Sequence, residues 1–209
     1  QVSIAEDPLA TVVLGNGTNG VVVSAGSDNV IGSATFGDTL LSGNGGDGVA
    51  ITGSATGTVV QGCYIGTSVS GMTALPNDGQ GVDIGGAAGN TVGPANVISG
   101  NLQSGVLLIS GATGTTVAGN FVGTNVIGTA AVGNALNGII VSGPNGNTNG
   151  PSNLLSGNGT NRVRPPSGPP RHPAQAHPLR PAAFPTPSTP APPPRAPVQP
   201  PATAQHRRG

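Results

Sequence analysis

The feature that most constrains the fold of this chain is a sequence unit that repeats after 57 residues. Residues 89–101 read Gly-Asn-Thr-Val-Gly-Pro-Ala-Asn-Val-Ile-Ser-Gly-Asn, and residues 146–158 read Gly-Asn-Thr-Asn-Gly-Pro-Ser-Asn-Leu-Leu-Ser-Gly-Asn. Each copy holds two short apolar segments, surrounded by Gly and Asn, which tolerate sharp backbone bends. This order of strand, bend, strand and bend predicts a chain that winds into a coil.

A shorter spacing lies inside this repeat. A Gly followed by apolar residues recurs at positions 20, 48, 81, 105 and 138, at intervals of 28, 33, 24 and 33 residues. A fixed period in this range indicates repeat architecture. The two long units, residues 48–80 and 105–137, align without gaps. We expect residues 68–80 and 125–137 to contain an excursion of about nine residues from a basic coil of about 24.

The first unit, residues 20–47, is a short unit with a small insertion. Residues 29–32 match residues 90–93, and residues 40–44 match residues 97–101. Residues 12–16 resemble the last third of an earlier coil. We therefore expect the chain to open in mid-repeat, with the true N-terminus missing.

The apolar segments have the features of short β-strands. Val82, Asp83 and Ile84 alternate inward, outward and inward, and Val, Ile and Thr dominate these segments. The Gly content excludes a helical bundle, because each interior Gly costs about 1 kcal/mol relative to Ala. One coil of three short strands cannot bury its own apolar face, whereas coils stacked at ~4.8 Å can.

Stacking places equivalent residues of successive coils above one another. We predict an inward aliphatic ladder of Val49, Val82, Val106 and Ile139. We also predict an Asn ladder at a bend, formed by Asn44, Asn101 and Asn158, whose amides would bond along the stack.

The repeated motifs resemble those of bacterial right-handed parallel β-helix repeat proteins of the pectin-lyase-like fold group. The motifs are Gly-Val-x-Ile, Asn-Thr-Val-Gly, Asn-Val-Ile-Ser-Gly-Asn and the Tyr-Ile-Gly-Thr segment that ends in Ala-Leu-Pro-Asn at residue 77. The resemblance covers roughly residues 8–161 and implies an all-β solenoid of about five coils. Members are typically large secreted or surface-attached proteins. The scaffold carries many unrelated functions, so the resemblance does not identify an activity.

The composition changes abruptly after residue 161. Residues 162–209 contain 16 of the 21 Pro, all seven Arg and all three His, whereas all seven acidic residues precede them. We therefore divide the chain into a β-helix domain, residues 1–161, and a disordered Pro- and Arg-rich tail, residues 162–209. The tail is either a native linker or the product of a reading-frame error. We favour the frame error, because the break falls inside a repeat.

Charge excludes several functions for residues 1–161. This part has no Lys, Arg or His, so it lacks the cations that a nucleic-acid surface needs. No apolar run approaches the ~20 residues of a membrane span. A lyase of the resembled fold group would use Arg or Lys, which are lacking here. One Cys excludes an internal disulfide framework.

Few residues could carry chemistry. Asp83 is the best-placed acid, but its expected neighbours are Ala50 and Leu107, so we interpret it as a solvated surface residue without a carboxylate partner. Residues 43–48 have a composition similar to calcium-binding repeats, in the wrong register and only once. Cys63 takes the place of Asn120 as a filler at a bend. We therefore predict no catalytic residue, no cofactor and no metal site.

Three function classes remain open. The first is a non-catalytic structural or adhesive segment of a larger secreted or cell-surface protein, with neighbouring coils or domains and extracellular glycans as candidate partners. The second is a fragment of a carbohydrate-active enzyme, a hydrolase, lyase or epimerase, whose catalytic coils lie outside this chain. The third is ice binding, which needs a regular outward Thr array. Thr91 and Thr148 correspond to Val59 and Thr116, so that array is broken.

Overall fold

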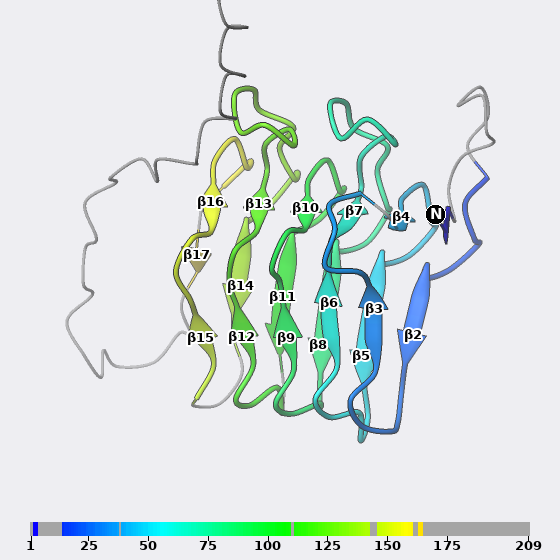
Figure 1. The fold of residues 1–209 in the computed structure, drawn as a ribbon, viewed down its shortest axis with the longest axis vertical. Coiled ribbons are helices and arrows are strands. Elements are labelled where there is room, and N and C mark those ends of the chain that lie inside the picture. The colour runs from blue at the N-terminus through cyan, green and yellow to red at the C-terminus, as the bar shows by residue number, and fades with distance from the viewer. Residues whose placement is uncertain are drawn as a thin grey trace, which may run out of the picture. The chain divides into compact units, whose positions relative to one another are not determined.

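The computed structural model describes residues 2–3, 14–37, 39–109, 111–142, 146–160 and 163–164, all within one unit, Gln1–Pro173. Short strands of two to four residues form three parallel sheets (Figure 1).

Sheet I consists, in spatial order, of β1 (Val2–Ser3), β4 (Thr39–Leu41), β7 (Cys63–Ile65), β10 (Val97–Ile98), β13 (Phe121–Val122) and β16 (Leu154–Leu155). Sheet II consists of β17 (Val163–Arg164), β14 (Ile139–Val141), β11 (Val106–Ile109), β8 (Val82–Gly85), β5 (Val49–Thr52) and β2 (Val21–Val23). Sheet III consists of β15 (Thr148–Asn149), β12 (Thr116–Val117), β9 (Thr91–Val92), β6 (Val59–Gln61) and β3 (Val30–Gly32).

The strand order shows a chain that visits the three sheets in turn. Each coil passes from sheet II to sheet III to sheet I, and five coils, beginning at β2, β5, β8, β11 and β14, contribute a strand to every sheet. Every ladder between consecutive coils is parallel. The described part of the chain contains no helix. The chain is therefore a parallel β-helix, as the sequence predicts.

The interior is filled by aliphatic ladders that the register generates. The predicted ladder is confirmed: Val49 pairs with Val82, Val82 with Val106, and Val106 with Ile139. All four side chains are fully buried. The Gly that precedes each of these strands is required by close packing. A Cβ on Gly81 would lie 2.6 Å from the carbonyl oxygen of Gly105 and 3.0 Å from the Asn101 amide.

A ladder of buried Asn side chains runs along the bend between sheets I and II. The Nδ2 group of Asn44 donates to Asn77 Oδ1 at 2.7 Å, and Asn77 Nδ2 donates to Asn101 Oδ1 at 2.8 Å. Asn134 continues this pattern: its Oδ1 accepts from Asn101 Nδ2, and its Nδ2 donates to Asn158 Oδ1. The predicted ladder exists, but its members are not direct neighbours. The sequence analysis did not include Asn77 and Asn134 in the ladder, because each follows an excursion, whereas both belong to the wall of the solenoid.

The excursions of the two long coils cover the outer surface of sheet I. They close through antiparallel bridges from Thr67 to Ala74 and from Thr124 to Ala131. Outward-facing residues of sheet I form a second apolar cluster, distinct from the interior one. Its buried members are Leu40, Tyr64, Val97 and Phe121, with Leu75, Val126 and Leu154 packed against them. The excursions therefore cover apolar side chains that would otherwise face solvent.

Both ends of the solenoid differ from the sequence-based picture. The backbone of Asn16 continues the Asn ladder, as expected for an earlier coil. The strand beside β4 is β1, whereas residues 12 and 13 lie outside the described residues. At the other end, Val163 and Arg164 pair with β14, so sheet II extends into the segment predicted to lack a fold. Residues 165–209 lie outside the described residues.

Candidate functional site

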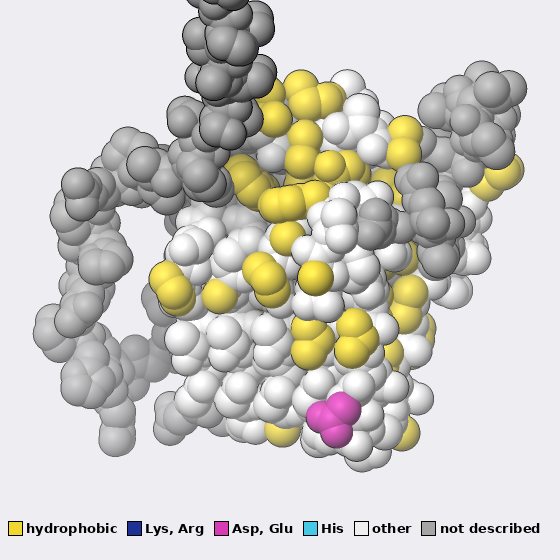
Figure 2. All heavy atoms as spheres, viewed as in Figure 1, with side chains coloured by type: hydrophobic (Ala, Val, Ile, Leu, Met, Phe, Trp, Pro, Cys, Tyr) yellow, Lys and Arg dark blue, Asp and Glu magenta, His cyan; other side chains and the backbone are white. Residues whose placement is uncertain are grey.

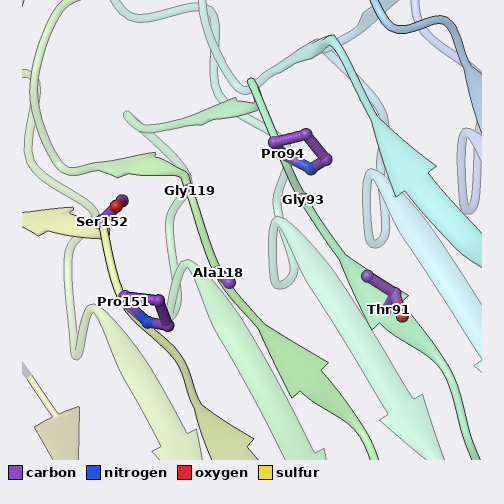
Figure 3. A pocket seen from close by; sticks show the side chains of 7 residues that line it. All are labelled: Thr91, Gly93, Pro94, Ala118, Gly119, Pro151 and Ser152. Atoms are coloured by element: carbon purple, nitrogen blue, oxygen red, sulfur yellow. The ribbon is translucent and has the colours of Figure 1, made fainter.

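A shallow hollow crosses three coils where the strands of sheet III end. Its volume is about 310 Å³, and we call it the trough. The lining residues are Thr91, Gly93, Pro94, Ala118, Gly119, Pro151 and Ser152 (Figure 3). Because β9, β12 and β15 are in parallel register, the residues that follow them come side by side. The Gly-Pro pair of each 57-residue copy thereby contributes one Pro to the trough.

The floor of the trough consists of residues without large side chains. A Cβ on Gly93 would overlap the carbonyl oxygen of Ala118, and a Cβ on Gly119 would lie 3.1 Å from the Pro94 ring. The wall beneath is held by a second Asn ladder, in which Asn96 Nδ2 donates to Asn120 Oδ1 at 2.9 Å. Replacement of these Gly would fill the hollow or displace its walls.

A row of Thr side chains borders the trough on sheet III. Thr91, Thr116 and Thr148 occupy successive strands at one register position. Val59 and Val30 occupy that position in the two preceding coils, which confirms the predicted interruption of the Thr array. In Figure 2 the described surface turned to the viewer is mostly uncharged and shows no Lys or Arg side chain. The trough itself is lined without any titratable side chain.

Asp83 lies on the outer side of sheet II, where the sequence placed it, but its environment differs from the prediction. Its strand neighbours are Ala50 and Leu107, as predicted. The side chain is only partly exposed, and its Oδ1 atom is buried without a hydrogen-bond partner. Burial, and to a smaller extent the charge of Asp47, raises the pKa of Asp83 to about 6. Asp83 is therefore less exposed to solvent than the sequence analysis expected, whereas the predicted lack of an acidic neighbour in the two adjacent strands holds.

Asp47 supplies the second carboxylate of this surface. Burial raises its pKa, and the backbone N–H of Gln80, which donates to Oδ1 at 2.7 Å, opposes that shift. The backbone N–H of Asp47 in turn donates to Asn19 Oδ1 at 2.7 Å. These bonds tie three successive coils together. The sequence analysis did not anticipate that the charge of Asp47 acts on Asp83, because Asp47 lies before its strand and is not in register with Asp83.

Asp47 also belongs to the Gly-rich segment that is similar in composition to a calcium repeat. Its carboxylate is engaged by the backbone of the next coil. No group of three or more metal-ligating side chains occurs among the described residues. The same part of the chain holds no helix long and apolar enough to cross a bilayer.

Cys63 occupies the end of the second Asn ladder, which confirms that it stands where later coils have Asn. Its backbone N–H donates to Asn96 Oδ1 at 2.9 Å, and its thiol donates to the carbonyl oxygen of Gln61 at 3.2 Å. Burial raises the pKa of the thiol to about 12. The thiolate that nucleophilic chemistry requires is therefore disfavoured.

Comparison with known proteins adds a likeness of fold. No protein-family model and no curated protein matches this chain. Among solved structures, it is similar to the Azotobacter vinelandii mannuronan C-5 epimerase AlgE4 A-module, with 18% sequence identity and a TM-score of 0.39. The match covers 73% of this chain and 52% of the A-module, so this chain spans about half of that structure.

Proposed function

We propose that this chain is a non-catalytic segment of a secreted or cell-surface β-helix protein, and that its trough binds neutral glycans. One observation carries the proposal: the trough crosses three coils and is lined by seven residues, none of which can act as an acid or a base. Such a surface can hold a ligand without transforming it.

The chemistry of the lining suits a sugar ring. A pyranose presents C–H groups on its faces and hydroxyl groups at its edge. Pro94, Ala118 and Pro151 offer apolar surface, whereas Thr91 and Ser152 offer hydroxyl groups that both donate and accept hydrogen bonds. Binding sites of this composition, mostly apolar with a few placed polar groups, are typical for small ligands.

The charge of the surface favours a neutral glycan over an acidic one. Recognition of carboxylated or sulfated sugars relies on Arg or Lys, which form strong charge-assisted hydrogen bonds. Lys, Arg and His are missing from residues 1–161. Uronic-acid polymers would therefore find no charged partner on the described surface of the trough.

Glycan-array binding and sedimentation with insoluble neutral polysaccharides test this proposal. The variant Ala118→Leu fills the trough floor and should weaken binding at least about tenfold, or ~1.4 kcal/mol. The matched control is Ala88→Leu, because Ala88 is also half-buried and lies outside the trough. Equal binding by both variants, or no binding by the unmodified chain to any neutral glycan, would contradict the proposal.

A second candidate function is favoured by the two acids. Glycoside hydrolysis uses one carboxyl group with a raised pKa and a second carboxylate. Asp83, with its pKa raised to about 6, and Asp47 meet this requirement in outline. The chain would then be a fragment of a carbohydrate-active enzyme. Release of reducing ends from a polysaccharide, lost in Asp83→Asn and retained in Ala118→Leu, would establish this function in place of the first.

A further inference from the structure

We propose that the inner corner where each coil passes from sheet II to sheet III binds two internal water molecules. The proposal concerns the interior of the solenoid and is independent of the proposed glycan binding. Two features of this corner carry it: a row of buried polar side chains, the polar row, and beside it a row of buried alanines, the alanine row. Both rows run through the coils that begin at β5, β8 and β11, each of which has a complete coil on either side.

The polar row consists of residues that precede the strands of sheet III. Thr58, Asn90 and Thr115 stand immediately before β6, β9 and β12, whose register places them in successive coils. The backbone follows the same order. The N–H of Thr91 donates to Thr58 O at 2.8 Å, and that of Thr116 donates to Asn90 O at 2.9 Å. Because all three side chains of the row are fully buried, each coil places one polar side chain inside the solenoid.

The protein itself uses only part of the hydrogen-bonding capacity of this row. Asn90 Oδ1 accepts a bond from the Thr58 N–H at 2.9 Å, so the amide oxygen is engaged. Asn90 Nδ2 and the Oγ1 atoms of Thr58 and Thr115 are buried and have no hydrogen-bond partner among the described residues. A buried polar group without a partner costs free energy, and internal water commonly bonds to such groups. Three of these atoms in one row therefore indicate water as their partner.

The alanine row gives this corner space. Ala55, Ala87 and Ala112 are buried and stand three residues before the members of the polar row. They lie in register, because the residues that follow them are joined by parallel bridges. Most other members of the interior cluster are Val, Ile or Leu, whose side chains are larger. The methyl groups of this row leave room beside the polar atoms that a larger side chain would fill.

The polar side chains face the alanine row. The next coil shows this directly, because Asn147, which follows Thr115 in the polar row, donates from Nδ2 to Ala112 O at 2.7 Å. Its Oδ1 accepts from the Thr115 N–H at 2.9 Å, just as Asn90 Oδ1 accepts from the Thr58 N–H. The two Asn side chains are therefore oriented alike, and Asn90 Nδ2 is directed to the same corner.

The spacing of the coils allows one water molecule to bond to two neighbouring members of the polar row. Adjacent parallel strands lie ~4.8 Å apart. Two consecutive hydrogen bonds of about 2.8 Å span up to about 5.6 Å, so a water placed between two coils reaches polar atoms of both. Waters that repeat with the coil spacing are too far apart to bond to each other. They are therefore separate sites and not a continuous hydrogen-bonded chain.

Asn90 stands at the centre of this arrangement. Its two Nδ2 hydrogens donate to one water on each side. One of these waters donates to Thr58 Oγ1, and the other donates to Thr115 Oγ1. Each water keeps a second hydrogen for a carbonyl oxygen of the alanine row, which gives it about three hydrogen bonds, the usual number for internal water.

The first experiment measures long-lived internal water in the 209-residue chain by water-oxygen relaxation dispersion. The double variant Thr58→Val, Thr115→Val should lose the contribution of two waters, because Val keeps the shape of Thr and removes the hydroxyl group. The matched control is Thr56→Val, Thr113→Val. These residues belong to the same two coils, lie in the neighbouring bridged row and are not fully buried, so the control should keep the full contribution.

The second experiment compares the urea midpoints of the same variants at neutral pH. A hydroxyl group that bonds to water stabilises the fold, so Thr58→Val, Thr115→Val should unfold at lower urea than the unmodified chain and the control. An unpaired hydroxyl group would give the opposite sign, because its removal relieves a cost. A midpoint at or above that of the unmodified chain, equal dispersion in the two double variants, or an unmodified chain without long-lived water would overturn the proposal. The last of these does not depend on the folding of either variant.

Discussion

Asp83→Asn should stabilise this protein near neutral pH. The carboxylate stands in an outward row of sheet II between Ala50 and Leu107, and its Oδ1 atom is buried without a hydrogen-bond partner. Burial, and secondarily the charge of Asp47, raises its pKa from 3.8 to about 6. At neutral pH the folded protein therefore holds an ionised group in an unfavourable place. The amide has nearly the same shape and no charge.

The magnitude follows from the shift in pKa. A shift of roughly 2 pKa units corresponds to about 3 kcal/mol, at 1.36 kcal/mol per unit. Because the side chain is only partly buried, solvent screening reduces this, and we expect about 1–2 kcal/mol. The folded state binds the proton more tightly than the unfolded state. Stability of the unmodified protein therefore falls as the pH rises from 3.8 through about 6.

Urea unfolding followed by circular dichroism, at several values between about pH 4 and about pH 7.5, measures this effect. The advantage of Asp83→Asn should be greatest at the upper end and shrink toward the lower end. Asp78→Asn is the control, because Asp78 is exposed and its substitution should change stability by less than about 0.5 kcal/mol. An Asp83→Asn protein no more stable than the unmodified one near neutral pH, or an advantage that does not vary with pH, would refute this reasoning.

Three further predictions concern the ladders, each measured by urea unfolding at neutral pH. Asn101→Ala should cost about 2–4 kcal/mol, because one N–H of the buried Asn77 amide loses its acceptor and Asn134 Oδ1 loses one of its two donors; a cost below ~1 kcal/mol would contradict this. Cys63→Asn should gain about 1 kcal/mol by adding a side-chain donor to Asn96 Oδ1, and a loss of stability would show that the site lacks room. Ile98→Ala should cost about 2–5 kcal/mol, whereas Thr91→Ala should cost less than about 0.5 kcal/mol; equal costs would mean that the inward and outward assignments are reversed.

The fold could be predicted from the sequence because the repeat carries its own register. Once Val82 and Val106 are recognised as equivalent, parallel stacking places them in contact, and the structure has that pairing. The Asn ladder was predicted only in alternate coils. Asn77 follows an excursion, and nothing in the local sequence shows that the chain has already returned to the wall at that residue.

The candidate site was less accessible to sequence reasoning. The second Pro of the trough, Pro151, lies 57 residues after Pro94, and the repeat makes both visible as equivalent bends. The sequence does not show that these two bends, with Gly119 between them, leave a hollow. The hollow depends on side-chain volumes across three coils. The environment of Asp83 was missed for a related reason. Partial burial of an outward side chain depends on its neighbours in adjacent coils, and the charge of Asp47 acts on it from a residue outside the strand register.

The closed base of each excursion makes it a natural place to display foreign peptides. Leu75 N–H donates to Gly66 O at 2.9 Å, and the Thr67–Ala74 bridge holds the two arms of the excursion together. The chain therefore returns to the wall of the solenoid at the same place, whatever the length of the segment between the two arms. Extending a closed loop costs only about 0.6 kcal/mol for each doubling of its length. Because the two excursions are linked by a bond from Val126 N–H to Gly71 O, two inserted sequences would emerge side by side, one from each long coil. The solenoid thus provides a fixed spacing between paired inserts, which a single flexible linker cannot.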